Sequence, residues 1–148
     1  DPAFYRKICG GDLDPVLATI RTAAKATHLE LTALLYTGHN DADEHVRKVI
    51  DFIAEMDREI PLHISRYFPM HRATAPPTPP DRLASARRIA RERLPYVYVG
   101  NMRLPGAEDT VCPGCGATVI RREGYRIDAR GLSGDRCAAC GARLRFVV

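Results

Sequence analysis

Four cysteines near the C-terminal end of the sequence have the spacing of metal ligands. Cys112 and Cys115 form one CxxC pair, Cys137 and Cys140 form a second, and a glycine follows each pair. Two intervening residues let both thiolates of a pair turn toward one ion, and the glycine permits the tight turn that follows. The pattern predicts a closed, structural four-thiolate site. Zinc is the expected metal, and iron, as a rubredoxin-like centre or an auxiliary cluster, is the alternative.

The segment that carries these cysteines is too short to fold on apolar burial alone. It has 37 residues from Cys112 to the last residue, and the 21 residues between the two pairs fit a hairpin with strands at 118–122 and 125–129. A structural zinc ion contributes on the order of 10–16 kcal/mol of binding free energy, which offsets the small core. The fifth cysteine, Cys9, has no partner at ligand spacing, and we expect a packed thiol there.

The remaining sequence alternates between helical and strand periodicity. Asp14 and Pro15 form a helix-start signal, and residues 29–36 (LELTALLY) form a mostly apolar run typical of a parallel strand buried on both faces. Helices and strands that alternate in this way predict parallel βα units. The expected helices cover residues 15–27, 42–57 and 81–93, and the expected strands cover 29–36, 60–66 and 95–99.

Polar and aromatic side chains follow each predicted strand, where ligands bind in parallel α/β folds. These segments are residues 36–41, 65–69 and 99–101. Asn40 and Asp41 also have a structural explanation as caps of the next helix, and His63 as a buried core histidine. Arg66 at a strand end requires a partner. No Ser/His/Asp or Cys/His pairing is visible by spacing.

The basic excess of the chain lies in its Cys-rich end. Residues 1–110 are balanced, whereas residues 111–148 contain seven Arg against three acidic residues, within a net charge of +4. This excess is compatible with a phosphate-binding surface. Biased composition is the favoured explanation, because the whole chain has 19 Arg and three Lys. Nucleic acid is therefore the less favoured partner.

Four segments carry a resemblance to a known family. Residues 4–11 (FYRKICGG), 37–41 (TGHND), 63–69 (HISRYFP) and 96–101 (YVYVGN) occur in this order. They resemble the C-terminal half of the AmmeMemoRadiSam-system radical SAM enzymes, which are related to the pyruvate formate-lyase activating enzymes. The two CxxCG pairs belong to the same resemblance, which covers essentially the whole chain. The HISRYFP segment, followed by APPTPP at 75–80, is its most specific part.

The resemblance implies an α/β fold with two parts. Residues 1–103 would be the C-terminal part of a partial (βα)6 radical SAM barrel, with three βα units, and residues 104–148 a small β zinc-ribbon module. Members of the family hold a 4Fe–4S cluster and cleave S-adenosylmethionine reductively to a 5′-deoxyadenosyl radical, which abstracts hydrogen from a substrate. By resemblance, five residues would contact S-adenosylmethionine or the substrate: Thr32, Leu34, Ser65, Arg66 and Phe68.

The CxxxCxxC loop that binds the cluster in this family has no counterpart in these 148 residues. We therefore expect a fragment of a longer enzyme, inactive by itself, with the first half of the barrel upstream of Asp1. Its substrate is unknown and could be a protein. The alternative function is a non-enzymatic metal ribbon that binds nucleic acid or a partner protein. The chain has no signal peptide and no apolar run that could cross a bilayer, so we expect a cytoplasmic protein without a membrane partner.

Overall fold

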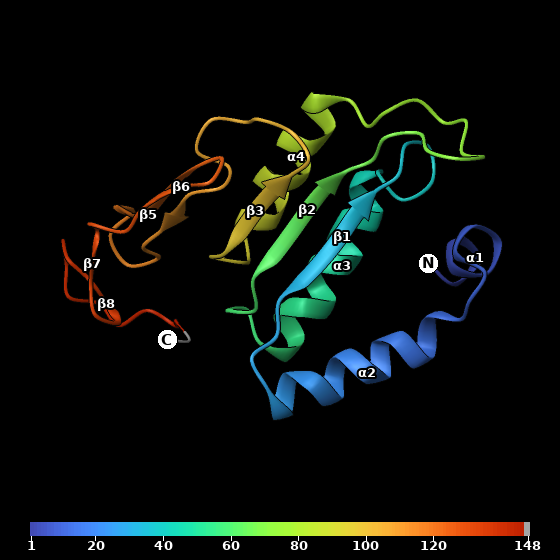
Figure 1. Ribbon diagram of the computed structural model, residues 1–148. Helices are drawn as coiled ribbons and strands as arrows, with labels where there is room; N and C mark the ends of the chain where they lie inside the picture. The colour runs from blue at the N-terminus through green and yellow to red at the C-terminus, as the bar shows by residue number, and fades with distance from the viewer. Residues whose placement is uncertain (147–148) are drawn as a thin grey trace.

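The computed structural model describes residues 1–146, and its larger part is built on a three-stranded parallel sheet (Figure 1). The strand order is β1-β2-β3, and a helix connects each strand to the next. The predicted alternation of parallel strands and helices is therefore confirmed. The elements are β1 (Leu31–Leu35), α3 (Asp43–Met56), β2 (Leu62–Arg66), α4 (Pro80–Arg91) and β3 (Val97–Gly100).

Three helical segments precede the sheet: α1 (Pro2–Phe4), a π-helix (Tyr5–Cys9) and α2 (Leu13–Ala26). The predicted start of α2 at Pro15 was wrong, because the helix begins at Leu13 after Asp12. Proline is tolerated there, since the first turn of a helix leaves its N–H groups unpaired. The prediction of a packed Cys9 was also wrong. Its thiol is exposed, because it lies at the end of a short surface helix.

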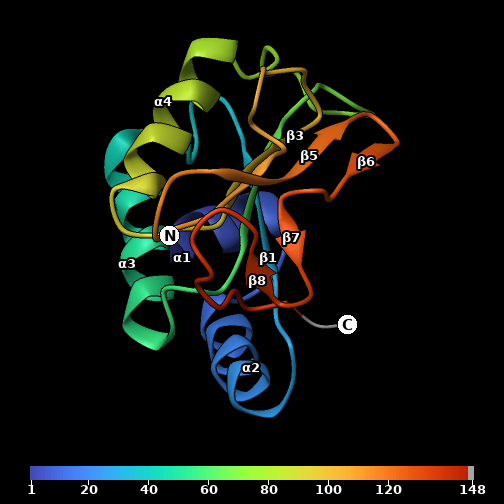
Figure 2. The ribbon, with the colours of Figure 1, turned by 90° about the vertical axis from the view of Figure 1, so that its left-hand side faces the viewer.

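Helices α3 and α4 cover one face of the sheet and form the main hydrophobic core with it (Figure 2). The helical periodicity of the sequence puts four residues of α4 inward, and all four are buried: Leu83, Ala86, Ile89 and Ala90. In α3 the same periodicity puts five residues inward: Val46, Val49, Ile50, Ile53 and Met56. Of these, Val49 is 40% exposed, whereas the other four are buried or partly buried. The fully buried core residues of the strands and helices include Leu62, Ile64, Val99, Ile50, Ile53, Leu83 and Ile89.

The opposite face of the sheet has no helix packed on it within residues 1–146, and we call it the open face. Two cross-strand rows form it: Thr32, His63 and Tyr98 in one, and Leu34, Ser65 and Gly100 in the other. The prediction that the first strand is buried on both faces was wrong. Thr32 is exposed and Leu34 is 47% exposed, because both helices lie on the other side.

The outer edge of β3 is covered by the segment that follows it. The N–H of Val99 donates to the carbonyl of Ala107 at 3.1 Å, and Ala107 is buried in the main core. The outer edge of β1, in contrast, pairs with no strand among the described residues. The sheet is thus closed on one edge and open on the other.

The C-terminal module is a set of short antiparallel strands with its own small core, which contains Val119, Ile120 and Leu144. The predicted hairpin is confirmed as β5 paired with β6. The module lies beside β3, toward the open face (Figures 1 and 2). Its strands are β4 (Thr110–Val111), β5 (Thr118–Glu123), β6 (Arg126–Asp128), β7 (Leu132–Ser133) and β8 (Arg136–Cys137). Throughout residues 1–146, no helix combines the length and apolarity that crossing a bilayer requires.

Candidate metal centre and strand-end pocket

The two CxxC pairs fold into turns with the same hydrogen bonds. In the first, the N–H of Cys112 donates to Ala117 O at 2.8 Å and the N–H of Gly116 donates to Cys112 O at 2.9 Å. The second turn repeats both bonds, at 2.9 and 2.8 Å, with Cys137, Ala142 and Gly141. Gly116 and Gly141 have φ values of 76° and 73°, a conformation that glycine adopts without steric cost. The sequence repeat is therefore a structural repeat.

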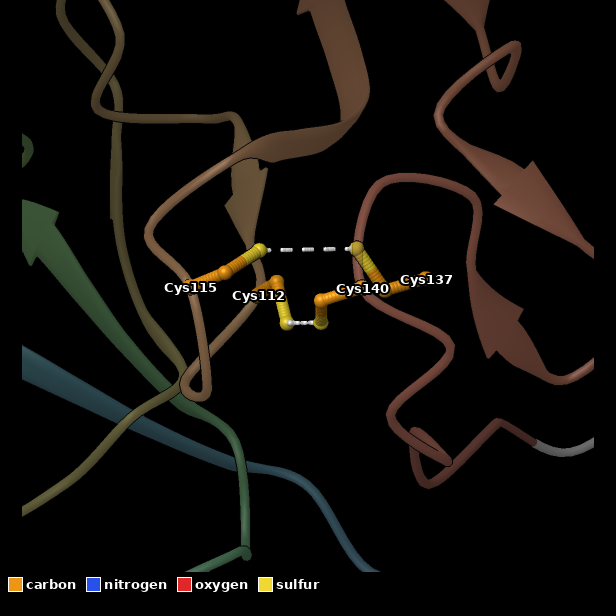
Figure 3. Close-up of side chains that lie close together, drawn as sticks. All are labelled: Cys112, Cys115, Cys137 and Cys140. Atoms are coloured by element: carbon orange, nitrogen blue, oxygen red, sulfur yellow. Dashed lines mark hydrogen bonds between the residues drawn. The ribbon is translucent and has the colours of Figure 1, made fainter.

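The four sulfur atoms converge on one point between the two turns (Figure 3). The Sγ atoms of Cys112 and Cys140 are 3.7 Å apart, as are those of Cys115 and Cys137, and all four lie within 4.8 Å of one another. Four sulfurs placed tetrahedrally at about 2.3 Å from zinc would be about 3.8 Å apart. The predicted ligands thus form a cluster that could hold a metal ion, and its dimensions are consistent with zinc.

The electrostatics of the cluster also favour a cation. Backbone N–H groups of Cys140 and Ala139 stabilise the Cys137 thiolate and lower the pKa of this thiol to about 7. The N–H of Ala117 acts in the same direction on Cys115, but the neighbouring sulfurs and burial together outweigh it and raise the pKa of Cys115 to about 12. Thiolates that share a site repel one another unless a positive ion lies between them, and a bound divalent metal ion removes this conflict.

Gly131 allows the second turn to pack against β5. Its carbonyl accepts from the N–H of Ala138 at 2.8 Å. A Cβ atom at this position would lie 2.5 Å from the carbonyl oxygen of Thr118 and 2.5 Å from the Cα of Val119. Only glycine lets the two backbones approach this closely, and the approach brings the second cysteine pair to the first.

A separate pocket lies where the sheet strands end, as the strand-end argument predicted. Its volume is about 440 Å³, and it is lined by Leu34, Arg66, Tyr67, Phe68, Met70 and Asn101. Three of the residues assigned by resemblance to cofactor or substrate contacts, Leu34, Arg66 and Phe68, line it. The other two, Thr32 and Ser65, lie on the open face outside its lining.

Thr78 fixes the loop over this pocket. Its side chain is fully buried, and its hydroxyl donates to Leu35 O at 2.5 Å and accepts from the N–H of Tyr67 at 3.3 Å. The Thr78 carbonyl accepts from Nε of Arg66 at 2.8 Å, and the Arg66 guanidinium lies 4.6 Å from the Phe68 ring centroid. One threonine from the Pro-rich loop therefore joins the ends of β1 and β2 and orients the arginine.

The prediction that Asn40 and Asp41 cap the next helix was wrong. Asn40 accepts from the N–H of Tyr36 at 2.6 Å and donates to Leu34 O at 2.9 Å, and Asp41 accepts from the N–H of Gly38 at 2.9 Å. Helix α3 follows Ala42 without a side-chain cap. These side chains instead bond to backbone groups at and just after the end of β1, which would have no partner where the strand stops.

A polar cluster on the open face was not anticipated from the sequence. Glu30 bonds to His28 at 3.1 Å and to His63 at 2.6 Å, and the His63 ring is stacked 5.1 Å from that of Tyr98. The core position expected for His63 was therefore wrong. Because alternate residues of a strand point to the same face, the spacing of Glu30 from Thr32 and Leu34 could have predicted Glu30 on the open face. The cluster lines a cavity of about 610 Å³ that Arg122, Arg145 and Phe146 of the C-terminal module also border.

Side chains of the C-terminal module contact the sheet around this cavity. Arg122 lies 5.5 Å from the Tyr98 ring centroid and donates to Thr110 Oγ1 at 2.8 Å, and Tyr98 shares a 2.9 Å hydrogen bond with the same hydroxyl. Arg145 forms an ion pair with Asp57, which precedes β2. The contacts are polar and hold the module against the open face.

Comparison with known proteins gives one informative alignment. The chain is 39% identical over 153 residues to an uncharacterized protein of Methanocaldococcus jannaschii, an alignment that covers 98% of this chain and 45% of the relative. The chain thus spans less than half the length of that protein. No protein-family description matches the chain, and no solved structure matches it.

Proposed function

We propose that this chain is the C-terminal part of a radical SAM enzyme with a structural zinc ribbon appended. The observation that carries the proposal is the one-sided parallel sheet, with α3 and α4 on one face and Thr32, His63, Ser65 and Tyr98 on the other. A sheet of a (βα) barrel has this asymmetry, since its helices lie outside and its inward side chains line the interior. Polar inward residues are typical of a barrel interior that holds a ligand.

Two further observations support the proposal. Among the described residues no strand pairs with the outer edge of β1, which leaves a place for another parallel strand, and the uncharacterized relative is more than twice as long as the aligned region. The strand-end pocket lies at the carboxyl ends of the strands, where a barrel of this kind would hold its ligands.

The residues of this chain would bind and position ligands. Thr32 and Ser65 present hydroxyls to the open face, while Leu34 and Phe68 offer apolar contact surface in the strand-end pocket. S-adenosylmethionine, reduced by a 4Fe–4S cluster, would supply the hydrogen-abstracting radical in the longer enzyme. The four-cysteine ribbon has no open ligand position, so its role would be structural.

The alternative, a nucleic-acid-binding ribbon, is less well supported. Most arginines of residues 111–148 make contacts within the chain, which compete with phosphate binding. Arg130 pairs with Asp128, Arg143 with Asp135 and Arg145 with Asp57. Arg122 and Arg136 donate to backbone carbonyls, at 2.9 and 3.0 Å. Binding to DNA or RNA that weakens steeply with salt would favour this alternative.

The experiment that tests the proposal begins with the gene sequence upstream of the codon for Asp1. A CxxxCxxC motif there would allow the longer protein to be reconstituted anaerobically with iron and sulfide. We then expect reductant-dependent formation of 5′-deoxyadenosine from S-adenosylmethionine. A longer protein with no such motif, or with a reconstituted cluster and no cleavage, would contradict the proposal.

A further inference from the structure

The strand-end pocket contains a positively charged side chain, Arg66, for which the described chain supplies no anionic partner. Arg66 is only partly buried, and among residues 1–146 no carboxylate lies at ion-pair distance from it. Its Nε bonds to the carbonyl of Thr78, and the two terminal nitrogens donate to no group of the described chain.

The guanidinium is held in place before any ligand arrives. The Nε bond to Thr78 and the stacking on Phe68 restrict its rotation, and Thr78 is fixed by both β1 and β2. Asn101, with the uncommon φ of 60°, donates to the backbone carbonyl of Arg66 at 3.3 Å. An oriented guanidinium loses less entropy on binding than a free one and offers two parallel N–H groups to a carboxylate or phosphate.

The surroundings of Arg66 are apolar and accessible. Leu34, Phe68 and Met70 are 47%, 44% and 77% exposed, and all three line the same pocket. A pocket with one fixed cation and apolar walls fits a ligand with an anionic group on an apolar body.

We infer that Arg66 is the anion-binding residue of the strand-end pocket, where its terminal nitrogens bind a carboxylate or phosphate while Leu34, Phe68 and Met70 contact an apolar part of the same ligand. The assignment of this ligand as the substrate rests on the proposed function. The binding itself depends only on residues of this chain and can be measured without a cluster or S-adenosylmethionine.

The test is calorimetric titration of the metal-loaded protein with benzoate, acetate, inorganic phosphate and the neutral isostere benzamide. We expect benzoate to bind more tightly than acetate, and benzamide to bind at least tenfold more weakly than benzoate. Tighter binding of phosphate than of benzoate, if it depends on Arg66, would support the site and identify the anion as a phosphate.

Arg66→Gln should lower the affinity for the tighter-binding anion, benzoate or phosphate, at least tenfold. Arg66→Lys should give an intermediate affinity, because lysine keeps the positive charge but lacks the two parallel N–H groups of the guanidinium. Arg72→Gln, an exposed arginine in the same loop, is the matched control and should bind like the unmodified protein. Equal affinities for Arg66→Gln and Arg72→Gln, or for benzoate and benzamide, would overturn the inference. Circular dichroism and metal content confirm that each variant is folded. A failure of S-adenosylmethionine cleavage in the longer protein would leave these affinities unchanged, so the two proposals fail separately.

Discussion

The Sγ atom of Cys112 lies 3.7 Å from that of Cys140, although the two residues are 28 positions apart in the chain. A disulfide requires about 2.05 Å between its sulfurs, whereas two thiolates on one zinc ion lie about 3.8 Å apart. Cys115 and Cys137 repeat the same distance. The spacing is therefore too long for disulfides and is that of a cluster that could hold one metal ion.

Replacing all four cysteines by serine should abolish metal binding and unfold the C-terminal module. The unmodified protein should contain one zinc ion per chain, because four thiolates complete the coordination. The sheet with α3 and α4 has a separate hydrophobic core and should keep its helical circular dichroism. Elemental analysis and two-dimensional NMR measure both effects.

The exposed Cys9 provides the control for this experiment, since Cys9→Ser should leave the metal content at one ion per chain. Freshly prepared protein without any bound metal would contradict the prediction, as would a four-serine variant with a folded ribbon.

Substitution of Gly131 by alanine should weaken the metal site without touching a ligand. The new Cβ would lie 2.5 Å from Thr118 O, and this clash with backbone requires β5 and the second cysteine turn to separate. We expect a loss of about 1–3 kcal/mol in folding free energy, measured as weaker zinc retention in competition with a chelator. Gly11→Ala is the control, because a Cβ there meets no atom within 4 Å and the residue lies far in sequence from the cysteine pairs. Equal zinc retention in the two variants would refute the argument.

Thr78→Val should destabilise the protein by about 1–3 kcal/mol, because it preserves shape but leaves Leu35 O and the N–H of Tyr67 without their hydroxyl partner. Urea denaturation monitored by circular dichroism measures the change. Thr74→Val, an exposed position in the same loop, should stay within about 0.5 kcal/mol of the unmodified protein. A Thr78 variant as stable as the Thr74 variant would show that the hydroxyl bonds contribute nothing.

The Glu30 cluster should make stability depend on pH in the acid range. The hydrogen bond from His28 lowers the pKa of Glu30 most, and His63 lowers it further against the opposing effect of burial. A carboxyl whose pKa is depressed on folding stabilises the native state fully above its unfolded pKa, about 4.5. This contribution disappears as pH falls through the lower folded pKa.

The measurement is the difference in unfolding free energy between the unmodified protein and Glu30→Gln, which share the same metal site. This difference should shrink as pH falls below about 4.5 and through the lower folded pKa of Glu30. A difference that stays constant down to pH 3 would contradict the assignment.

Local pattern predicted the elements of this protein well. The periodicity of α4 identified its buried face, and the two CxxCG repeats identified both metal-ligand turns, because each depends on residues only a few positions apart. The apolar run in β1 was correctly assigned as a strand. Its burial was not, because burial on the second face depends on whether another layer packs there.

The sequence by itself determined the strand–helix alternation, the four cysteines that cluster and the region of the strand-end pocket. Only the tertiary structure decided that His63 faces outward onto Glu30, that Asn40 completes β1 rather than capping α3, and that Thr78 orients Arg66. These relationships join residues across strands and loops, where several partners satisfy the same polar group equally well. The fold selects one of them by bringing together strands and loops that lie far apart in the sequence.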